Sequence, residues 1–215
     1  GYPQGSGESE MKVIIACKLT DEITPEDCDY IGVDKGALFL ARQGIHMVCA
    51  IGDFDSVEQE DLKLIHQFSR EVVCLNPIKD DTDAQAAIEK ADSLGYQQME
   101  ILGATGGRID HELINLRLTM QYPGRVILKD DRNLIMAYPA GTHHVKAGDY
   151  PYFSFFTQSE DVLTLHGFAY PLERRRITCY DLYTVSNQLI GETGTFINEK
   201  NPVLLIRSRD EKKDS

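Results

Sequence analysis

The sequence lacks tryptophan, Cys-x-x-Cys pairs and any apolar run long enough to cross a membrane. Basic residues are also scarce: 22 Lys and Arg stand against 34 Asp and Glu, so the formal net charge is −12. Such an acidic chain is a poor partner for nucleic acid or an anionic membrane. No signal peptide is visible and the five cysteines are an odd number. We therefore expect reduced thiols in a cytoplasmic protein, with Cys49 and Cys74 in the core.

Two common nucleotide-binding motifs are missing as well. Neither G-x-x-x-x-G-K-[ST] nor a complete G-x-G-x-x-G occurs, which argues against an ordinary P-loop or NAD site. The acidity does not exclude a nucleotide, because Mg²⁺ and a few basic groups can reverse the sign of the charge inside a site. The remaining composition, 42% hydrophobic and 26% charged over 215 residues, is that of a globular protein with one large or two small domains.

The hydrophobic pattern changes near residue 129. Before it, from residue 11, short apolar runs alternate with segments of helical spacing, which predicts an α/β domain with a mostly parallel sheet. From 130 to 208, short β-rich runs are separated by Gly, Pro, Asn or Asp turns, which predicts a small antiparallel sandwich or barrel. The β-rich runs from the boundary onward are 126–128, 134–138, 152–156, 162–165, 182–185 and 203–206. We expect residues 1–10 to be an expression remnant before Met11 and 209–215 to be a disordered tail.

A pair of carboxylates, Asp53 and Asp55, follows an apolar run at 47–51 that has the make-up of a buried strand. In an extended segment they lie on the same side, and about 4 Å apart they would repel by roughly 4 kcal/mol at an effective dielectric near 20. A hard cation such as Mg²⁺ relieves that repulsion. The bland alternative is that one Asp caps the next helix, which the capping-box pattern from Ser56 to Gln59 predicts over 57–69.

Polar side chains follow four of the predicted strands. They are Asp34; Asp53 and Asp55; Asp80, Asp81 and Asp83; and Arg108, Asp110 and His111. Thr82 and Gln85 form a second capping box, and Asp83 would complement the dipole of the helix that it opens. Neither role explains the carboxylates of Asp80 and Asp81. The glycine-rich turn 103–107 would let backbone N–H groups approach phosphate, with Arg108 adding donors before a helix over 112–121. Because ligands of open α/β sheets bind at the carboxyl ends of strands, the pattern predicts a metal–polyphosphate site.

In order and spacing, these segments resemble the thiamin pyrophosphokinase family of the bacterial type. The resemblance covers about Met11 to Arg207, and one departure is that Ala16-Cys17-Lys18 stands where the family often has a glycine pair. The motifs that carry it are Asp34-Lys35-Gly36-Ala37, Gly52-Asp53-Phe54-Asp55-Ser56, Lys79-Asp80-Asp81-Thr82-Asp83, Gly103 to His111 with Asn115, Gly167 to Leu172, and Val185-Ser186-Asn187.

The resemblance implies a Rossmann-like catalytic domain, a C-terminal β-sandwich domain and a homodimer with active sites between subunits. It implies Mg²⁺-dependent transfer of pyrophosphate from ATP to the hydroxyl of thiamin, with release of AMP. The metal ligands and catalytic carboxylates it implies are Asp53, Asp55, Asp81 and Asp83, with Arg108 also catalytic. The implied ATP-binding residues are Asp34, Lys79, Thr82, Gly106, Gly107, Arg108, Asp110, His111 and Asn115. The implied thiamin contacts are Ser186, Asn187 and Tyr170.

Two other functions stay open: pyrophosphate transfer to a pterin alcohol, and a non-catalytic sensor of nucleotide or thiamin diphosphate. Segments 167–172 and 186–187 favour thiamin, and the retention of every acidic cluster favours an enzyme. The identity of the general base is open, and His111 is explained equally well by orienting the start of a helix. Tyr170, Tyr180 and Tyr183 are candidates for stacking on thiamin or for the core of the β domain.

Overall fold

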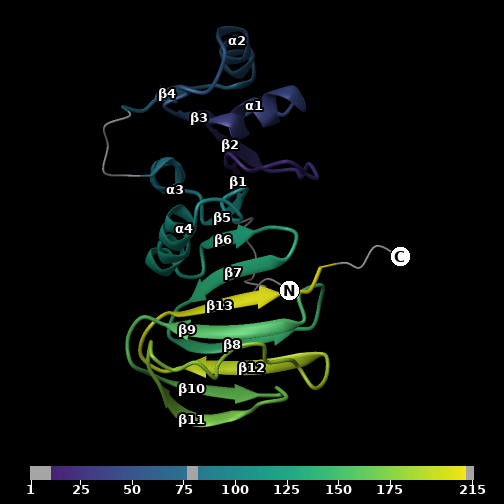
Figure 1. Cartoon of the computed structure of the whole chain (residues 1–215), viewed down its shortest axis with the longest axis vertical. Coiled ribbons are helices and arrows are strands. Elements are labelled where there is room, and N and C mark those ends of the chain that lie inside the picture. The colour runs from purple at the N-terminus through teal and green to yellow at the C-terminus, as the bar shows by residue number, and fades with distance from the viewer. Residues whose placement is uncertain (1–10, 77–81, 212–215) are drawn as a thin grey trace. The chain divides into compact units, whose positions relative to one another are not determined.

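The computed structural model describes residues 11–76 and 82–211 (Figure 1). These residues form two compact units, which we call the α/β unit (11–118 and 128–130) and the β unit (119–127 and 131–211). The first elements in chain order are β1 (Lys12–Ala16), β2 (Asp29–Val33), α1 (Lys35–Arg42), β3 (Cys49–Gly52), α2 (Gln59–Phe68), β4 (Val72–Cys74), α3 (Asp83–Ser93), β5 (Gln98–Leu102), α4 (Ile109–Gln121) and β6 (Val126–Lys129). The strands that follow are β7 (Asn133–Tyr138), β8 (Gly141–Lys146), β9 (Tyr152–Thr157), β10 (Asp161–His166), β11 (Leu172–Ile177), β12 (Thr193–Asn198) and β13 (Val203–Ser208).

The sheet of the α/β unit has the strand order β4-β3-β2-β1-β5. All four strand pairs are parallel, with Ile14 opposite Tyr30 on one side and opposite Glu100 on the other. The carboxyl ends therefore meet at one edge of the sheet. Strands β1 to β4 progress in one direction and β5 lies on the opposite side of β1, so the order reverses between β1 and β5. Ligands of such sheets bind at this reversal.

Helices bury both faces of this sheet, which explains why its strands are almost continuously apolar. Alternate strand residues such as Ile14 and Ala16 share a core with α1 and α2. The intervening residues, such as Val13 and Ile15, are equally buried and point to the opposite face. There α3 packs on β1, β2 and β3 through Ala87, Ile88 and Ala91. Burying each large aliphatic side chain stabilises the unit by about 1.5–3 kcal/mol.

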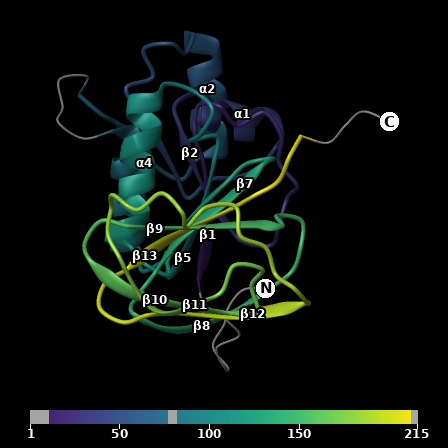
Figure 2. The ribbon, with the colours of Figure 1, turned by 60° about the horizontal axis from the view of Figure 1, so that its bottom comes forward.

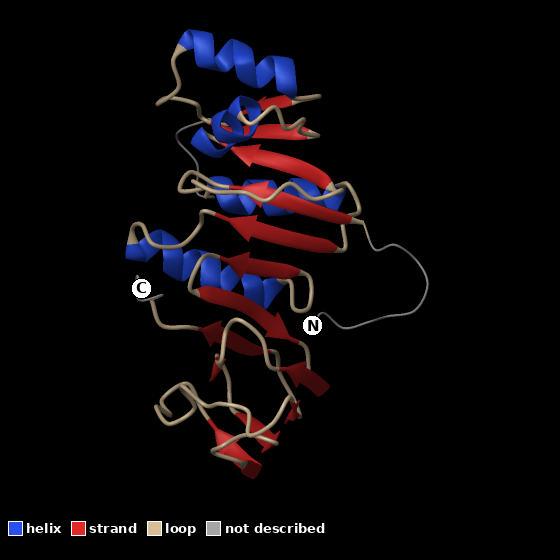
Figure 3. Cartoon of the chain, turned by 90° about the vertical axis from the view of Figure 1, so that its right-hand side faces the viewer, coloured by secondary structure: helices blue, strands red, loops and turns tan. Residues whose placement is uncertain are grey.

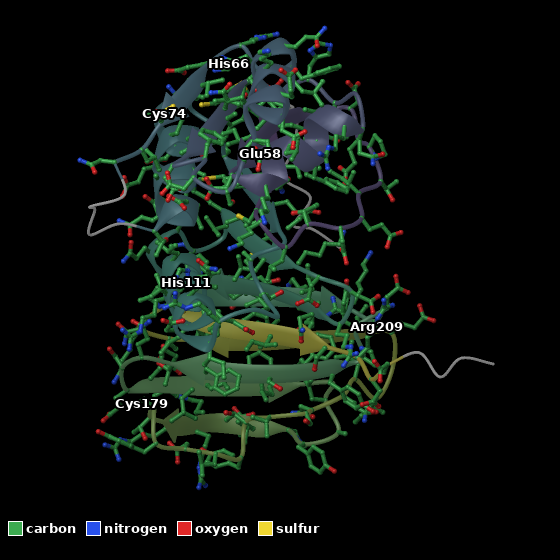
Figure 4. The ribbon with its side chains drawn as sticks, turned by 45° about the horizontal axis from the view of Figure 1, so that its top comes forward. Glu58, His66, Cys74, His111, Cys179 and Arg209 are labelled. Atoms are coloured by element: carbon green, nitrogen blue, oxygen red, sulfur yellow. The ribbon has the colours of Figure 1, made fainter. Side chains whose placement is uncertain are left out.

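Two helix starts differ from the sequence prediction. Helix α2 begins at Gln59, not at 57, because Val57 N–H donates to the Phe54 carbonyl (2.9 Å) and closes a separate turn. Its N-cap is Glu58, labelled in Figure 4, so the predicted cap at Ser56 is wrong. Helix α4 begins at Ile109, three residues earlier than predicted. The cap of α3 is confirmed, since the Thr82 hydroxyl accepts the N–H of Gln85 at 3.2 Å.

The β unit is a sandwich of two antiparallel sheets. One has the order β7-β13-β9 and the other β11-β10-β12-β8, seen together in Figure 2. Phe153 and Phe155 from the first sheet and Leu163, Leu165 and Phe196 from the second share one core. The described helices all end by Gln121, and only strands and loops come after them. Helices and strands are distinguished by colour in Figure 3. The predicted fold class, an α/β domain followed by a β-sandwich, is confirmed.

The predicted strand at 182–185 is wrong. This segment is irregular and places Leu182, Tyr183 and Val185 at the surface, while the Thr184 carbonyl accepts from Phe155 N–H at 2.8 Å. The prediction missed β8, β11 and β12, whose sequences carry few apolar residues. In β11, for example, the exposed run Glu173 to Arg176 stands on an edge strand, where charged side chains discourage pairing with another chain.

All five cysteines lie within the described residues and are free. Cys49 is buried as predicted, but Cys74, labelled in Figure 4, is exposed at the end of β4, so its predicted place in the core is wrong. Edge position explains this, because β4 has a neighbour on one side only. Of the helices in the described residues, none has the length and apolar character needed to span a bilayer.

Candidate active site

A cleft of about 750 Å³ opens at the carboxyl ends of the strands of the α/β unit. Its size is within the range of small-molecule sites. It is lined by Cys17, Lys18, Leu19, Val33, Asp34, Asp53, Asp55, Ser56, Asn76, Thr82, Asp83, Ala84, Gly103, Ala104, Gly107, Arg108, His111 and Asn115. The structure thus brings together most of the residues predicted for metal and ATP. Lys79 and Asp81 lie outside the described residues, and both remain predictions.

The carboxylates occupy one side of the cleft. Asp34 follows β2, Asp53 and Asp55 follow β3, and Asp83 begins α3. Asp34 is at the N-cap position of α1 but makes no side-chain cap. The cap of α2 is Glu58, so neither Asp53 nor Asp55 caps a helix. None of these carboxylates therefore caps a helix, and only Asp83, in the first turn of α3 after its cap Thr82, is explained as a charge that complements the helix dipole.

The backbone is shaped to hold Asp34 against the turn after β3. Asp34 N–H donates to the Ile51 carbonyl at 2.9 Å, and the Asp34 Oδ1 accepts Phe54 N–H at 3.2 Å. Gly52 passes so close that a Cβ there would lie 1.9 Å from Oδ1, so only glycine fits. Asp34 and Phe54 both have positive φ, 49° and 53°, a conformation that costs about 1–3 kcal/mol and clusters at functional sites.

Electrostatic crowding marks the same place. Burial, reinforced by a hydrogen bond with Asp83 and by the charges of Asp83 and Asp53, raises the pKa of Asp34 to about 7. The N–H of Asp55 donates to Asp53 Oδ1 at 3.0 Å, which holds the two residues of the pair in a tight turn. Carboxylates gathered in this way favour a bound cation.

The oxygen donors fit a hard cation such as Mg²⁺, which binds carboxylates and keeps several waters. The gathering of Asp34, Asp53, Asp55 and Asp83 in one cleft supports this, because a bound cation offsets the repulsion between neighbouring carboxylates. Within 11–76 and 82–211, no three His, Cys, Asp or Glu side chains are already gathered as a metal site. Asp53, Asp55 and Asp83, with Asp81, would have to close around the ion.

The turns after β1 and β5 form the other side of the cleft. Cys17 N–H donates to the Leu102 carbonyl (2.9 Å) and Leu19 N–H to the Gly103 carbonyl (3.1 Å), so the two turns are joined. Gly103 lies against Thr20, whose backbone nitrogen would be 2.2 Å from an added Cβ. Arg108 follows at the rim, and its guanidinium pairs with Asp110 at 2.5 Å. Arg108 holds the pKa of Asp110 below its ordinary value.

Three of the residues predicted to bind ATP have local partners. The buried Asn115 donates from Nδ2 to the Ala104 carbonyl at 2.8 Å and so supports the glycine-rich turn from α4. Gly106 N–H donates to Glu112 at 3.3 Å. Asp110 accepts from Arg108 and from the backbone N–H of His111. His111 itself, labelled in Figure 4, is exposed in the first turn of α4. It lines the cleft.

The residues predicted for thiamin lie in the β unit and are described there by themselves. Asn187 is buried, and its Oδ1 accepts the N–H groups of Tyr170 (3.0 Å) and Gln188 (3.0 Å), while Nδ2 donates to the Tyr170 carbonyl (2.8 Å). Ser186 is exposed, with φ of 54°, and no described residue partners its hydroxyl. Tyr170 is 70% exposed, Tyr180 87% and Tyr183 46%, so the alternative that these tyrosines form the core is wrong.

The sequence prediction missed part of the lining. Cys17, Lys18 and Leu19 after β1, Ser56 after β3 and Asn76 after β4 all face the cleft. Each of them follows the carboxyl end of a parallel strand, and this position is the signal that could have identified them. The segment after β1 contains the departure of Ala16-Cys17-Lys18 from the glycine pair of the family, and the resemblance therefore implied no site residue there.

Comparisons with known proteins agree with this geometry. The family model described as "Thiamin pyrophosphokinase, catalytic domain" matches residues 23–129, and "Thiamin pyrophosphokinase, vitamin B1 binding domain" matches residues 142–204. The chain is 37% identical over 195 residues to a thiamine pyrophosphokinase of Bacillus subtilis, covering 87% of this chain and 90% of that protein.

Solved structures are similar along nearly the whole chain. The crystal structure of thiamine pyrophosphokinase from Bacillus subtilis matches with a TM-score of 0.83 at 34% identity, covering 93% of this chain and 100% of that one. A thiamin pyrophosphokinase family protein from Enterococcus faecalis matches with a TM-score of 0.82 at 30% identity, covering 94% and 100%. These matches favour thiamin over a pterin alcohol and an enzyme over a sensor.

Proposed function

Because the chain belongs to the thiamin pyrophosphokinase family and is therefore a pyrophosphotransferase, we propose that the cleft of its α/β unit binds ATP with Mg²⁺. The hydroxyl oxygen of thiamin attacks the β-phosphorus of ATP. The bond from that phosphorus to the oxygen bridging to the α-phosphate breaks, and the products are thiamin diphosphate and AMP. The observation that carries this proposal is the cluster of Asp34, Asp53, Asp55 and Asp83 in one cleft with Arg108.

Each side of the cleft has its own part in the proposed reaction. Asp53, Asp55 and Asp83, with Asp81, are the proposed ligands of Mg²⁺, which when bound neutralises charge developing on the phosphate oxygens. Arg108, with Lys79, would clamp the phosphates, and the fork of the guanidinium suits two phosphate oxygens at once. Thr82, Gly107 and the start of α4 would approach the nucleotide through backbone N–H groups. Gly106, whose N–H donates to Glu112, would shape the turn beside it.

We further propose that Asp34 supports the metal ligands instead of joining them. Its Oδ1 accepts the Phe54 N–H, so one of its carboxylate oxygens is already used by the turn after β3. Asn115 and Asp110 would act similarly on the other side, because their polar groups contact the turn and Arg108. These three residues are positioning residues in the proposal, while the general base is one of the remaining carboxylates.

Thiamin would contact the β unit, through the exposed hydroxyl of Ser186 and the exposed ring of Tyr170. Asn187 supports this site by holding Tyr170 through two hydrogen bonds. We propose a homodimer whose active sites form between subunits. Five free thiols suit a reducing compartment, and we propose the cytoplasm.

Product analysis tests the proposal directly. The protein is mixed with ATP, Mg²⁺ and thiamin, and nucleotides and thiamin esters are separated and quantified. We expect AMP and thiamin diphosphate in equal amounts, with no product when Mg²⁺ is chelated or thiamin is omitted. ADP with thiamin monophosphate would mean transfer of a single phosphoryl group and would contradict the proposal. A pterin alcohol in place of thiamin serves as the acceptor control and should give no AMP.

A further inference from the structure

The turn after β1 carries a lysine that the proposed reaction has not yet used. Residues 17–20 form a tight turn closed by Thr20 N–H donating to the Cys17 carbonyl at 3.0 Å. Lys18 stands at the tip of this turn, exposed, and lines the cleft, whereas Cys17 beside it is buried. The turn is therefore built to present this side chain at the cleft.

The place of this turn is set by the glycine-rich turn after β5. Cys17 and Leu19, on either side of Lys18, donate their N–H groups to the carbonyls of Leu102 and Gly103. An added Cβ at Gly107 would lie 2.8 Å from the Leu19 side chain, so the two turns are in close contact. Lys18 is thus held beside the turn with Gly107 and Arg108. This is also the point at which the strand order reverses, between β1 and β5.

The distribution of charge in the cleft also favours a role for Lys18 in binding an anion. Among the described residues that line the cleft, Lys18 and Arg108 are the cationic side chains, against the carboxylates of Asp34, Asp53, Asp55 and Asp83. The guanidinium of Arg108 is engaged with Asp110, whereas no carboxylate within the described ranges pairs with the Lys18 ammonium. In an acidic cleft of an acidic protein, an unpaired ammonium group at the rim is suited to a phosphate oxygen.

We propose that Lys18 is an ATP-binding residue, whose ammonium group donates to the polyphosphate chain from the β1 side of the cleft. This inference rests on the proposed function, since it requires ATP in the cleft. Lys18 and Arg108 would then contact the phosphates from two joined turns, opposite the carboxylates that bind the metal. The role is in binding, so Lys18 raises the affinity for ATP more than it changes the rate of the chemical step.

Isothermal titration with ATP and Mg²⁺, in the absence of thiamin, tests this for the wild type and for Lys18→Met. This substitution keeps an unbranched side chain that is one atom shorter and removes its charge. We expect Lys18→Met to weaken ATP binding about 10- to 100-fold, as for loss of one charge-assisted hydrogen bond. Adenosine binding should change by less than about twofold, and Lys18→Arg should restore most of the ATP affinity. The KM for ATP should rise accordingly, with the KM for thiamin unchanged.

Lys63→Met is the matched control, because it makes the same change in charge on an exposed face of α2 outside the cleft. It should bind ATP as the wild type does. The inference would be overturned if Lys18→Met bound ATP within about twofold of the wild type. It would also be overturned if the variant lost affinity for ATP and adenosine equally, because that result would mean that the turn itself had changed. If the wild type forms AMP from thiamin and ATP while Lys18→Met binds ATP as the wild type does, this inference is rejected and the proposed function stands. A wild type that binds no ATP would reject both proposals.

Discussion

The two regions that carry the motifs use their polar side chains differently. In the α/β unit, the carboxylates of Asp53, Asp55 and Asp83 line a cleft and cap no helix, since the N-caps of α2 and α3 are Glu58 and Thr82. In the β unit, the amide of Asn187 makes three hydrogen bonds to neighbouring backbone. A sequence motif can therefore contain side chains that face a binding cleft or side chains that hold the backbone in place. The hydrogen-bond partners of each side chain distinguish the two cases.

Substituting the carboxylates of the cleft should give the largest loss of activity. Asp53→Asn or Asp55→Asn should lower turnover about 100- to 1,000-fold, because each removes negative charge from the proposed Mg²⁺ site. The fold should persist, since neither side chain hydrogen-bonds to a buried group among residues 11–76 and 82–211. Steady-state AMP formation at several Mg²⁺ concentrations, with circular dichroism, measures both effects. Asp27→Asn, an exposed position away from the cleft, is the control.

If both variants kept wild-type turnover at limiting Mg²⁺, the carboxylates would not be metal ligands. The contrast between the ligand-binding side chains of the α/β unit and the structural amide of Asn187 in the β unit would then fail. Partial recovery of either variant at high Mg²⁺ would instead support the assignment, because a weakened site fills at higher concentration of the ion.

The next effect concerns the backbone that positions these carboxylates. Gly52→Ala places a methyl group where Asp34 Oδ1 lies, so Asp34 must move away from the Phe54 N–H. We expect turnover to fall by about tenfold or more and unfolding to become easier by about 1–3 kcal/mol. Gly44→Ala is the control. Both glycines have a positive φ (72° at Gly44 and 157° at Gly52), but a Cβ added at Gly44 meets nothing within 4 Å, so only stability should fall. Equal turnover in both variants would contradict the close approach to Asp34.

In the β unit, two neighbouring substitutions separate scaffold from contact. Asn187→Ala removes a buried amide that satisfies three backbone groups, so the free energy of unfolding should fall by about 2–3 kcal/mol. Ser186→Ala removes an exposed hydroxyl and should leave stability nearly unchanged, while the KM for thiamin rises. Chemical denaturation and steady-state kinetics measure the two quantities. A large loss of stability from Ser186→Ala, or none from Asn187→Ala, would reverse the assignment.

How far the sequence predicts this structure depends on the kind of signal. The strand ends that carry Asp34, Asp53 and Asp83 can be located from apolar runs and capping residues, both of which are local in the chain. The start of α2 cannot, because the turn that displaces it depends on the positive φ of Phe54. Segment 182–185 has the composition of a strand, yet backbone contacts with Phe155 keep it irregular. Likewise, nothing in the sequence of the β1 turn shows that Leu102 and Gly103 hold Lys18 at the cleft.

The smallest effect tests the crowding of carboxylates without a substrate. Burial and Asp83 raise the pKa of Asp34 to about 7, above its value of 3.8 as a free side chain. This half-buried carboxyl therefore favours the folded state below about pH 4, and that contribution is lost as the pH rises through about 7. Asp34→Asn should thus gain stability relative to wild type between pH 4 and 8, by about 1–2 kcal/mol after solvent screening is considered. Thermal unfolding in chelator measures the difference, and Mg²⁺ at pH 8 should reduce it by stabilising the wild type. If the difference in stability between Asp34→Asn and the wild type stayed constant from pH 4 to 8, the carboxylates of the cleft would not repel one another. The α/β unit would then lose the feature that most clearly separates it from the β unit.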